Sequence, residues 1–452
     1  MRKSVIFKSL FVVTLTAGIL SCNKSAHIIY IEAENFKHRG GWVIDQQSID
    51  LIGSSYVLAH GLGVPVEDSE TIIEIPSSGK YHVWVRTRNW VAPWNDEMAP
   101  GRFQIVVEGV PLDTIFGTKG TKWHWQNGGR IKLKRGEVSL SLHDLTGFEG
   151  RCDAIYLSPV KEKPPSLSGD LKLWRTAKSS ESETPDETLD FDLVITGGGI
   201  AGCAASIAAA EQGLKVALIH DRPILGGNAS SEIRVHTEGI TWKSDRILSM
   251  LNTVWWPNGS PDAAADDRKR HQNIEKYDNI TLFLNWRAYS TGSSDSVISH
   301  VDARHTSSGE TMRFTAPFFA DCTGDGWIGY WAGAEYMYGR EASSEYGEGW
   351  DQHGELWSPS EPDNRVMGAS VLWRTKNAGK PVEFPPVPWA AEVAGGYAAT
   401  SGTWKWEYSD DDVHQIEDAE KIRDHMLKAI YGSFSNAKAR SENDSLELEW
   451  VS

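Results

Sequence analysis

Short runs of alternating apolar and polar residues follow one another between Ile28 and Val160. Tyr81–Val85 and Phe103–Val107, for example, alternate with the period of strands that bury one face. Turn sequences such as Ser77–Lys80 separate the runs, and no helical periodicity comes between them. The pattern therefore predicts an all-β sandwich over residues 28–160.

The pattern changes twice after this region. Residues 161–190 are mostly charged and polar, which is typical of a linker. Two apolar runs, Leu193–Thr196 and Lys215–Ile219, then flank an Ala-rich stretch at Cys203–Gln212. This order of buried strand, helix and buried strand predicts an α/β, Rossmann-like domain over residues 191–452.

A glycine-rich turn joins the first of these strands to the helix. Gly197, Gly199 and Gly202 match the pattern G-x-G-x-x-G. In a βαβ unit the first glycine permits the tight turn, the second lets a pyrophosphate approach the backbone, and the third lets the helix pack closely on the strand. The N–H groups at the start of the helix then face the phosphates. The sequence thus predicts an FAD/NAD(P)-binding domain with cofactor contacts at these three glycines.

The acidic residue that holds the adenosine ribose departs from the usual pattern. That residue normally ends the second strand, where this chain has His220, and Asp221 follows it. Either Asp221 reaches the ribose from a shifted position, or His220 replaces the carboxylate as a hydrogen-bonding partner. We prefer Asp221 of the two.

Two further motifs resemble those of a known family. The run after the second strand contains Gly226 and Gly227 and then the polar residues Asn228, Ser230 and Ser231. It resembles the flavin loop of FAD-dependent oxidoreductases of the two-dinucleotide-domain type from bacterial carbohydrate-utilisation loci. In that family the Gly-Gly turn passes close to the flavin, and the polar side chains line its edge.

The second motif is Thr323-Gly324-Asp325-Gly326, which follows the apolar run Phe318–Ala320. It resembles the point at which a returning strand ends beside the dinucleotide. Together the two motifs imply FAD as the cofactor, with contacts at Gly226, Gly227, Asn228, Thr323, Gly324 and Asp325, and they disfavour a nicotinamide dehydrogenase. Family members continue past the stretch like Leu448–Val451, so the resemblance also implies a domain that is incomplete at its C-terminus and holds FAD weakly.

The ends of the sandwich resemble carbohydrate-binding modules of the galactose-binding-like class. It opens with Ile31–Asn35 and closes with Arg151–Leu157. In those modules the first and last strands pair, and the resemblance implies a structural Ca²⁺ held by Glu32, Glu34 and Asp153. Carboxylate oxygens are the ligands that Ca²⁺ prefers. The alternative is that these are simply strand and turn carboxylates.

Composition narrows the choice of partners. The net charge of −16 offers no basic face for nucleic acid, so we expect no such partner. The 20 Trp residues are suited either to stacking on sugar rings or to packing in the core. Cys152, Cys203 and Cys322 are too widely spaced for a metal or disulfide framework, and we expect buried thiols.

Residues 1–22 have the pattern of an export signal. Arg2 and Lys3 precede a mostly apolar run, and Ile19-Leu20-Ser21-Cys22 resembles the lipobox of bacterial lipoproteins. The resemblance implies lipidation of Cys22 and a location at the bacterial cell envelope, with the lipid as the membrane anchor. An uncleaved anchor is the alternative, although the apolar run is short for a bilayer span.

The chemistry expected is hydride transfer to the flavin, with a protein group taking the proton of the substrate hydroxyl. His236 is the preferred base because it follows the flavin loop closely, with His353 and Glu407 as weaker candidates. The sequence thus predicts an exported FAD-dependent oxidoreductase acting on a carbohydrate or related polyol. The alternative is a carbohydrate-binding lipoprotein with an inactive flavin domain.

Overall fold

The computed structural model describes residues 28–165, 174, 185–237, 245–252, 259–294, 296–402, 406–410 and 412–452. The predicted export signal and part of the predicted linker lie outside these ranges, so lipidation of Cys22 stays a prediction. In the described ranges, no helix combines the length and apolar character that a bilayer span requires.

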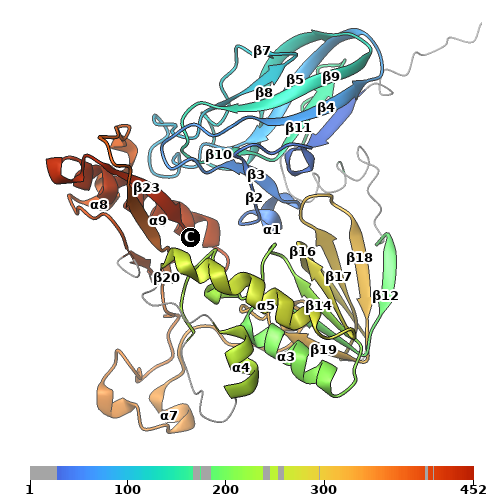
Figure 1. The fold of residues 1–452 in the computed structure, drawn as a ribbon, viewed down its shortest axis with the longest axis vertical. Coiled ribbons are helices and arrows are strands. Elements are labelled where there is room, and N and C mark those ends of the chain that lie inside the picture. Colours follow the sequence, from blue (N-terminus) through green and yellow to red (C-terminus); the bar gives the residue numbers. More distant parts are fainter. Residues whose placement is uncertain are drawn as a thin grey trace, which may run out of the picture.

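The first part of the chain is an antiparallel β-sandwich (Figure 1). Its sheets have the strand orders β1-β11-β5-β8, β4-β9-β6-β7 and β10-β3-β2. The strands are β1 (Ile29–Glu32), β2 (Val43–Asp45), β3 (Tyr56–Ala59), β4 (Ser69–Ile75), β5 (Gly79–Thr87), β6 (Phe103–Val107), β7 (Val110–Pro111), β8 (His124–Leu133), β9 (Gly136–Asp144), β10 (Gly150–Cys152) and β11 (Ala154–Ser158), with short helices η2 (Ala33–Asn35) and α1 (Ile49–Ile52). The predicted all-β sandwich is confirmed.

Side chains that alternate along these strands fill the sandwich. In β5, Tyr81, Val83 and Val85 point into one apolar core. The first and last strands pair, with Ile29 opposite Leu157. Several tryptophans are fully buried, among them Trp42, Trp90, Trp125 and Trp373, so packing accounts for these members of the Trp excess.

The second part is built on a parallel sheet of order β15-β14-β13-β19. Its strands are β13 (Leu193–Thr196), β14 (Val216–His220), β15 (Ile280–Leu284) and β19 (Phe318–Asp321), and helix α3 (Ile200–Glu211) connects β13 to β14. The predicted βαβ unit is therefore present, and the α/β fold class is confirmed.

Both faces of the parallel sheet are covered, which is why its strands are apolar throughout. Ile195 and Leu218 pack under α3, α4 (Asp245–Leu251) and α5 (Ala265–Glu275). Val194 and Ile219 face a second sheet of order β12-β18-β17-β16. The strands of this sheet are β12 (Glu187–Asp190), β16 (Trp286–Ser294), β17 (Val297–His305) and β18 (Thr311–Thr315).

Strand β12 corrects the predicted linker. Glu187–Asp190 was assigned to the linker because it is largely polar, but it pairs in parallel with β18. Three of its four side chains are exposed, so an edge position explains the polar composition. Trp174, also in the predicted linker, packs against Tyr30, Trp125 and Tyr156 of the sandwich.

The C-terminal part packs against the sandwich rather than standing apart from it (Figure 1). Helix α9 (Ala419–Lys438) places Tyr431 and Phe434 in a core that also contains Trp90 and Phe148 of the sandwich. The remaining elements are α6 (Trp327–Trp331), α7 (Ser343–Tyr346), α8 (Ala391–Ala394), β20 (Ala369–Ser370), β21 (Trp373–Asn377), β22 (Glu407–Tyr408) and β23 (Leu446–Val451), with the short helices η3 (Gly227–Ala229), η4 (Pro261–Ala264), η5 (Asp351–His353), η6 (Pro388–Ala390) and η7 (Ser441–Asn443).

Candidate functional site

A cleft of about 970 Å³ lies at the carboxyl ends of β13, β14 and β19. This is the edge at which open parallel sheets bind ligands. The volume is at the upper end of the range of roughly 300–1,000 Å³ that ligand pockets span. One wall is the glycine turn with the loops after β14 and β19, and the other comes from the sandwich and α9.

The three glycines of the turn have different surroundings, and a side chain would be accommodated differently at each. Gly197 has φ +104°, and a Cβ there would lie 2.0 Å from the carbonyl oxygen of Cys322. A Cβ on Gly202 would lie 1.8 Å from the carbonyl oxygen of Gly197, so the helix could not pack as closely. A Cβ on Gly199 meets no atom within 4 Å, because this residue borders the cleft.

Gly199 is also the N-cap of α3, whose first turn has no acidic residue. Its free N–H groups and the positive end of the helix dipole therefore favour an anion in the cleft. The turn can accept a pyrophosphate at Gly199 without any change of side chain. The residues present thus fit the phosphate part of a dinucleotide.

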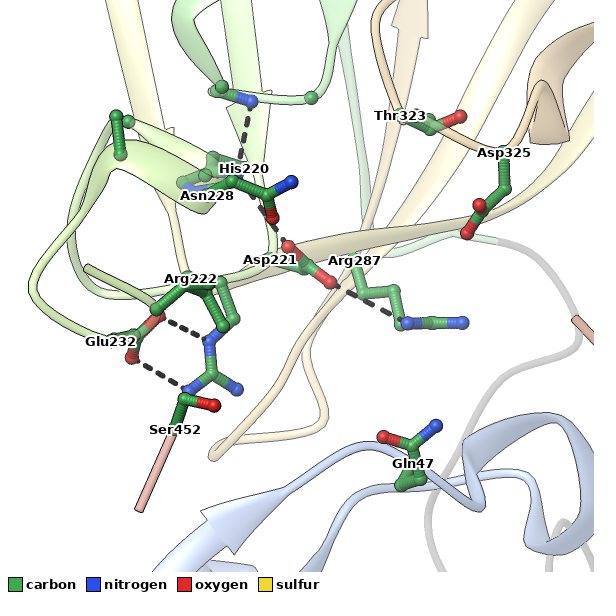
Figure 2. Close-up of a pocket in the computed structure, with 18 of the residues that line it drawn as sticks. Gln47, His220, Asp221, Arg222, Asn228, Glu232, Arg287, Thr323, Asp325 and Ser452 are labelled. Carbon is green, nitrogen blue, oxygen red and sulfur yellow. Dashed lines mark hydrogen bonds and ion pairs between the residues drawn. The ribbon is translucent and has the colours of Figure 1, made fainter. Parts of the chain in front are cut away.

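The two candidates for the ribose contact have different surroundings (Figure 2). Nδ1 of His220 accepts a hydrogen bond from Gly198 N at 3.0 Å, and Nε2 lies 3.0 Å from the Ile224 carbonyl oxygen. Burial lowers the pKa of His220, which keeps the ring neutral with its hydrogen on Nε2. Both ring nitrogens are thus engaged with backbone atoms, one in the glycine turn and the other in the loop after β14.

The surroundings of Asp221 fit the predicted ribose contact better. Its carboxylate borders the cleft and lies 3.5 Å from Nη1 of Arg287. Figure 2 shows this pair with Gln47 of the sandwich opposite it. Gln46, the neighbour of Gln47, donates from Nε2 to the Asp221 carbonyl oxygen at 2.8 Å. The sandwich therefore touches the loop that would hold the adenosine end.

The Gly-Gly turn lies beside the glycine turn. Gly226 N donates to the Gly198 carbonyl oxygen at 2.9 Å, and Gly226 has φ +122°. Gly227 and Asn228 border the cleft, whereas Ser230 and Ser231 do not belong to its described lining. That these two serines line the flavin edge therefore stays a prediction.

The returning strand β19 delivers Thr323, Gly324 and Asp325 to the cleft, as Figure 2 shows for the two labelled side chains. Asp321, which the sequence analysis did not single out, organises this turn. Its Oδ1 accepts from Thr323 Oγ1 at 2.7 Å, and its Oδ2 accepts from Ile328 N at 2.8 Å. It caps the start of α6 and thereby fixes the Thr-Gly-Asp-Gly return.

Of the three predicted bases, only His236 borders the cleft. His353 is an exposed residue of η5 whose ring contacts the ring of Trp350. Glu407 is an exposed residue of β22. Neither belongs to the described lining of the cleft, so the structure does not favour either residue as the catalytic base. Cys322 also departs from expectation, because it is only partly buried and borders the cleft, while Cys152 and Cys203 are buried.

The sandwich wall contributes residues that sequence reasoning missed. His60 and Glu149 border the cleft together with Asp45 and Arg423. Asp45 of β2 and Arg423 of α9 form an ion pair, and Arg423 Nη2 donates to Tyr56 Oη at 3.1 Å. Burial acts to raise the pKa of Asp45, but the Arg423 guanidinium holds it at about 2. Nothing local in the sequence marks these residues as neighbours.

Away from the cleft, Glu32, Glu34 and Asp153 are brought together. Their carboxylate oxygens lie within 4.8 Å of one another, and all three residues are buried. Arg86 Nη1 lies 3.0 Å from Asp153 Oδ2 and supplies one positive charge to this cluster. The three carboxylates are the donor set that suits a hard cation such as Ca²⁺.

The fold and the cleft define a dinucleotide-binding type of α/β domain behind a β-sandwich. Residues 192–406 match the family described as FAD dependent oxidoreductase. This match supports an FAD-dependent oxidoreductase domain in this region, and the sandwich lies N-terminal to it.

Relatives with known names match only in part. The mitochondrial glycerol-3-phosphate dehydrogenase of Mus musculus is 26% identical over 146 residues, covering 32% of this chain and 16% of that protein. The probable mitochondrial glycerol-3-phosphate dehydrogenase of Dictyostelium discoideum is 29% identical over 79 residues, covering 18% of this chain and 12% of that protein. The chain thus spans less than a fifth of the length of these relatives.

Among solved structures, a family 35 carbohydrate-binding module from Clostridium thermocellum is 20% identical with a TM-score of 0.24. The match covers 29% of this chain and 98% of that module. The glycerol-3-phosphate dehydrogenase from Bacillus halodurans, complexed with FAD, is 13% identical with a TM-score of 0.22, covering 29% of this chain and 34% of that one.

Proposed function

We propose that this protein oxidises a carbohydrate or a related polyol by hydride transfer to FAD. The observation that supports the proposal best is the composition of the cleft walls. One wall is the glycine turn at Gly197–Gly202, and the facing wall comes from the sandwich, whose first and last strands have sequences that resemble those of carbohydrate-binding modules. A substrate between the walls would therefore meet the flavin and the sandwich at the same time.

Residues of the cleft would hold FAD at its phosphates, its ribose and its flavin. Gly199 and the start of α3 would take the pyrophosphate, Asp221 the adenosine ribose, and the Gly226–Asn228 turn the flavin side. When bound, FAD accepts the hydride, and the protein supplies orientation and electrostatics. Polar groups of the facing wall, such as Gln47 and Arg423, suit a substrate rich in hydroxyls.

The test uses the chain from Asn23 to Ser452, mixed with FAD and passed through gel filtration. We expect a yellow protein that retains the flavin absorption bands. Glucose, mannose, galactose, sorbitol and glycerol are then added without oxygen, and loss of the visible flavin band reports hydride transfer. Retained flavin that none of these alcohols bleaches would contradict the proposed substrate class.

A second outcome would favour the alternative function. Colourless protein that is still retarded on a polysaccharide column would identify a carbohydrate-binding protein without flavin chemistry. Retardation is measured against a column of the same matrix without polysaccharide, so that nonspecific adsorption is subtracted.

We also propose that Cys22 is lipidated and anchors the protein at the bacterial cell envelope. The support is the sequence Leu20-Ser21-Cys22 after an apolar run. Cys22→Ser should release the protein from the membrane fraction of the bacteria that express it. Retention of this variant in the membrane fraction would instead indicate an uncleaved anchor.

A further proposal is that Glu32, Glu34 and Asp153 hold a structural Ca²⁺. Carboxylates this close repel one another when they are charged, and Arg86 supplies one positive charge to Asp153. A divalent cation would neutralise the remaining charge. The proposal is independent of the flavin chemistry, and its test is described in the Discussion.

A further inference from the structure

His60 enters the cleft from the sandwich, directly after β3. Its side chain is 24% exposed, and Nδ1 lies 2.9 and 3.1 Å from the two carboxylate oxygens of Glu149. An ionised carboxylate only accepts hydrogen bonds, so Nδ1 carries the hydrogen and Nε2 of the neutral ring is an acceptor. Among the described residues, no hydrogen bond to His60 Nε2 is recorded. This nitrogen is available to a molecule in the cleft.

Glu149 is held so that it can orient the ring. Its side chain is fully buried, and its backbone has φ +61°, a conformation that a glutamate rarely adopts. The backbone N of Glu149 donates to the Ala59 carbonyl oxygen at 3.0 Å, and Tyr431 of α9 donates from its hydroxyl to Oε1 at 2.5 Å. The carboxylate is thereby held from the sandwich and from α9 at once.

We propose that His60 is the catalytic base of this oxidoreductase, supplied by the sandwich, and that Glu149 is its positioning residue. The proposal deepens the proposed function and rests on it. His60 Nε2 would take the proton of the substrate O–H bond as the C=O bond of the product forms. When bound, FAD would supply the two-electron acceptor for the hydride of the substrate C–H bond, so that the oxidation of the alcohol balances.

The surrounding charges favour this role. The groups that face His60 are Glu149 and Asp45 from the sandwich and Arg423 and Tyr431 from α9. Burial acts to lower the pKa of His60, but the charge of Glu149 and its hydrogen bond outweigh burial, and the pKa is raised. A histidine with a raised pKa is a stronger proton acceptor once the pH exceeds that pKa.

The first experiment measures flavin bleaching by the most reactive alcohol of the panel in three FAD-loaded variants. His60→Gln should reduce the rate by about 10²–10⁴-fold at unchanged FAD content. Glu149→Gln should move the acidic limb of the pH–rate profile to lower pH, because the neutral amide no longer stabilises the imidazolium. The matched control is His143→Gln, which should bleach at close to the wild-type rate, because His143 also pairs with a carboxylate, Asp68 at 2.8 Å, but does not belong to the described lining of the cleft.

A second measurement needs no substrate. Diethyl pyrocarbonate modifies neutral, accessible imidazoles, and mass spectrometry of the wild-type protein reports its addition to His60. Loading with FAD should slow this addition, since the flavin would cover the cleft in front of Nε2. The result does not depend on whether His60→Gln folds.

The outcomes separate the two proposals. Bleaching in the wild type at the same rate as in His60→Gln overturns the assignment of His60 and leaves the proposed function standing. Addition to His60 that FAD does not slow also overturns it. A wild-type protein that retains FAD but that no alcohol of the panel bleaches refutes the proposed function and, with it, the role of His60.

Discussion

Arg151 of the sandwich and Asp424 of α9 form a bidentate ion pair from which solvent is fully excluded. Arg151 Nη1 lies 3.0 Å from Asp424 Oδ2, Nη2 contacts Oδ1, and both side chains are 0% exposed. Arg88 joins them, with Nη1 2.6 Å from Glu420 Oε1. Two guanidiniums from the sandwich thus face two carboxylates from α9, which balances the charge across the contact between the two parts.

Removing one partner of this pair should be costly. Arg151→Met removes the bidentate partner of the buried Asp424 and leaves only the longer contacts to Arg88 at 3.8 Å and Arg423 at 3.9 Å. We expect the free energy of unfolding to fall by about 3–5 kcal/mol. Urea unfolding followed by fluorescence measures the change. The control is Lys376→Met, because Lys376 pairs with Glu447 at 3.3 Å while half exposed, and its loss should cost less than about 1 kcal/mol. Equal effects of the two substitutions would show that the buried pair does not hold the parts together.

Gly199→Val should abolish FAD binding without unfolding the protein. A Cβ at this position meets no protein atom within 4 Å, but it would occupy the space of the pyrophosphate. We expect at least a 100-fold loss of affinity, about 2.7 kcal/mol, in flavin titrations. Ala208→Val places the same side chain on the exposed side of α3 and should bind FAD as the wild type does. Full flavin occupancy in Gly199→Val would mean that the phosphates bind elsewhere.

Asp221→Ala should weaken FAD binding by about 10- to 100-fold, since a hydrogen bond from a ribose hydroxyl to a carboxylate contributes roughly 1.5–3 kcal/mol. The matched control is Asp50→Ala. Asp50 also pairs with Arg287, at 3.2 Å, but it does not belong to the described lining of the cleft. If both variants lose affinity equally, the effect comes through Arg287 and not through the ribose.

Chelation of divalent cations should destabilise the sandwich. Without a cation the carboxylates of Glu32, Glu34 and Asp153 repel one another, and we expect the melting temperature to fall by about 5 °C or more in excess EDTA. Added Ca²⁺ should restore it. In Glu32→Gln/Glu34→Gln the repulsion is gone, so EDTA should no longer change the melting temperature. An EDTA effect that persists in this variant would place the cation elsewhere.

Asp45 should contribute to acid unfolding. Its pKa is lowered from 3.8 to about 2 in the folded protein, where burial opposes and Arg423 favours the charged form. The stabilisation, roughly 2 kcal/mol, is therefore present above pH 3.8 and is lost as the pH falls towards 2. We expect Asp45→Asn to be less stable than the wild type at neutral pH and to approach it at low pH. A constant difference across this range would contradict the assignment.

The elements around the cofactor turn could be predicted from the sequence because their causes are local. Gly197 and Gly202 are required by backbone atoms of the same turn and of the strand beside it. Alternation along β5 and the unbroken apolar runs of β13 and β14 depend only on which faces are buried. For the same reason the order of the sandwich and the α/β domain was predictable.

The contact between the two parts was decided by tertiary structure alone. The polar segment between them predicts a linker and no particular contact, and an arginine such as Arg151 is expected from the sequence to lie at the surface. Its burial depends on Asp424, which is 273 positions away, and no local pattern encodes that pairing. The same packing places His60 and Glu149 in the cleft of a domain that begins more than 40 residues after Glu149. Local patterns determined which elements form, whereas the long-range pairing of buried charges decided which side chains share the site.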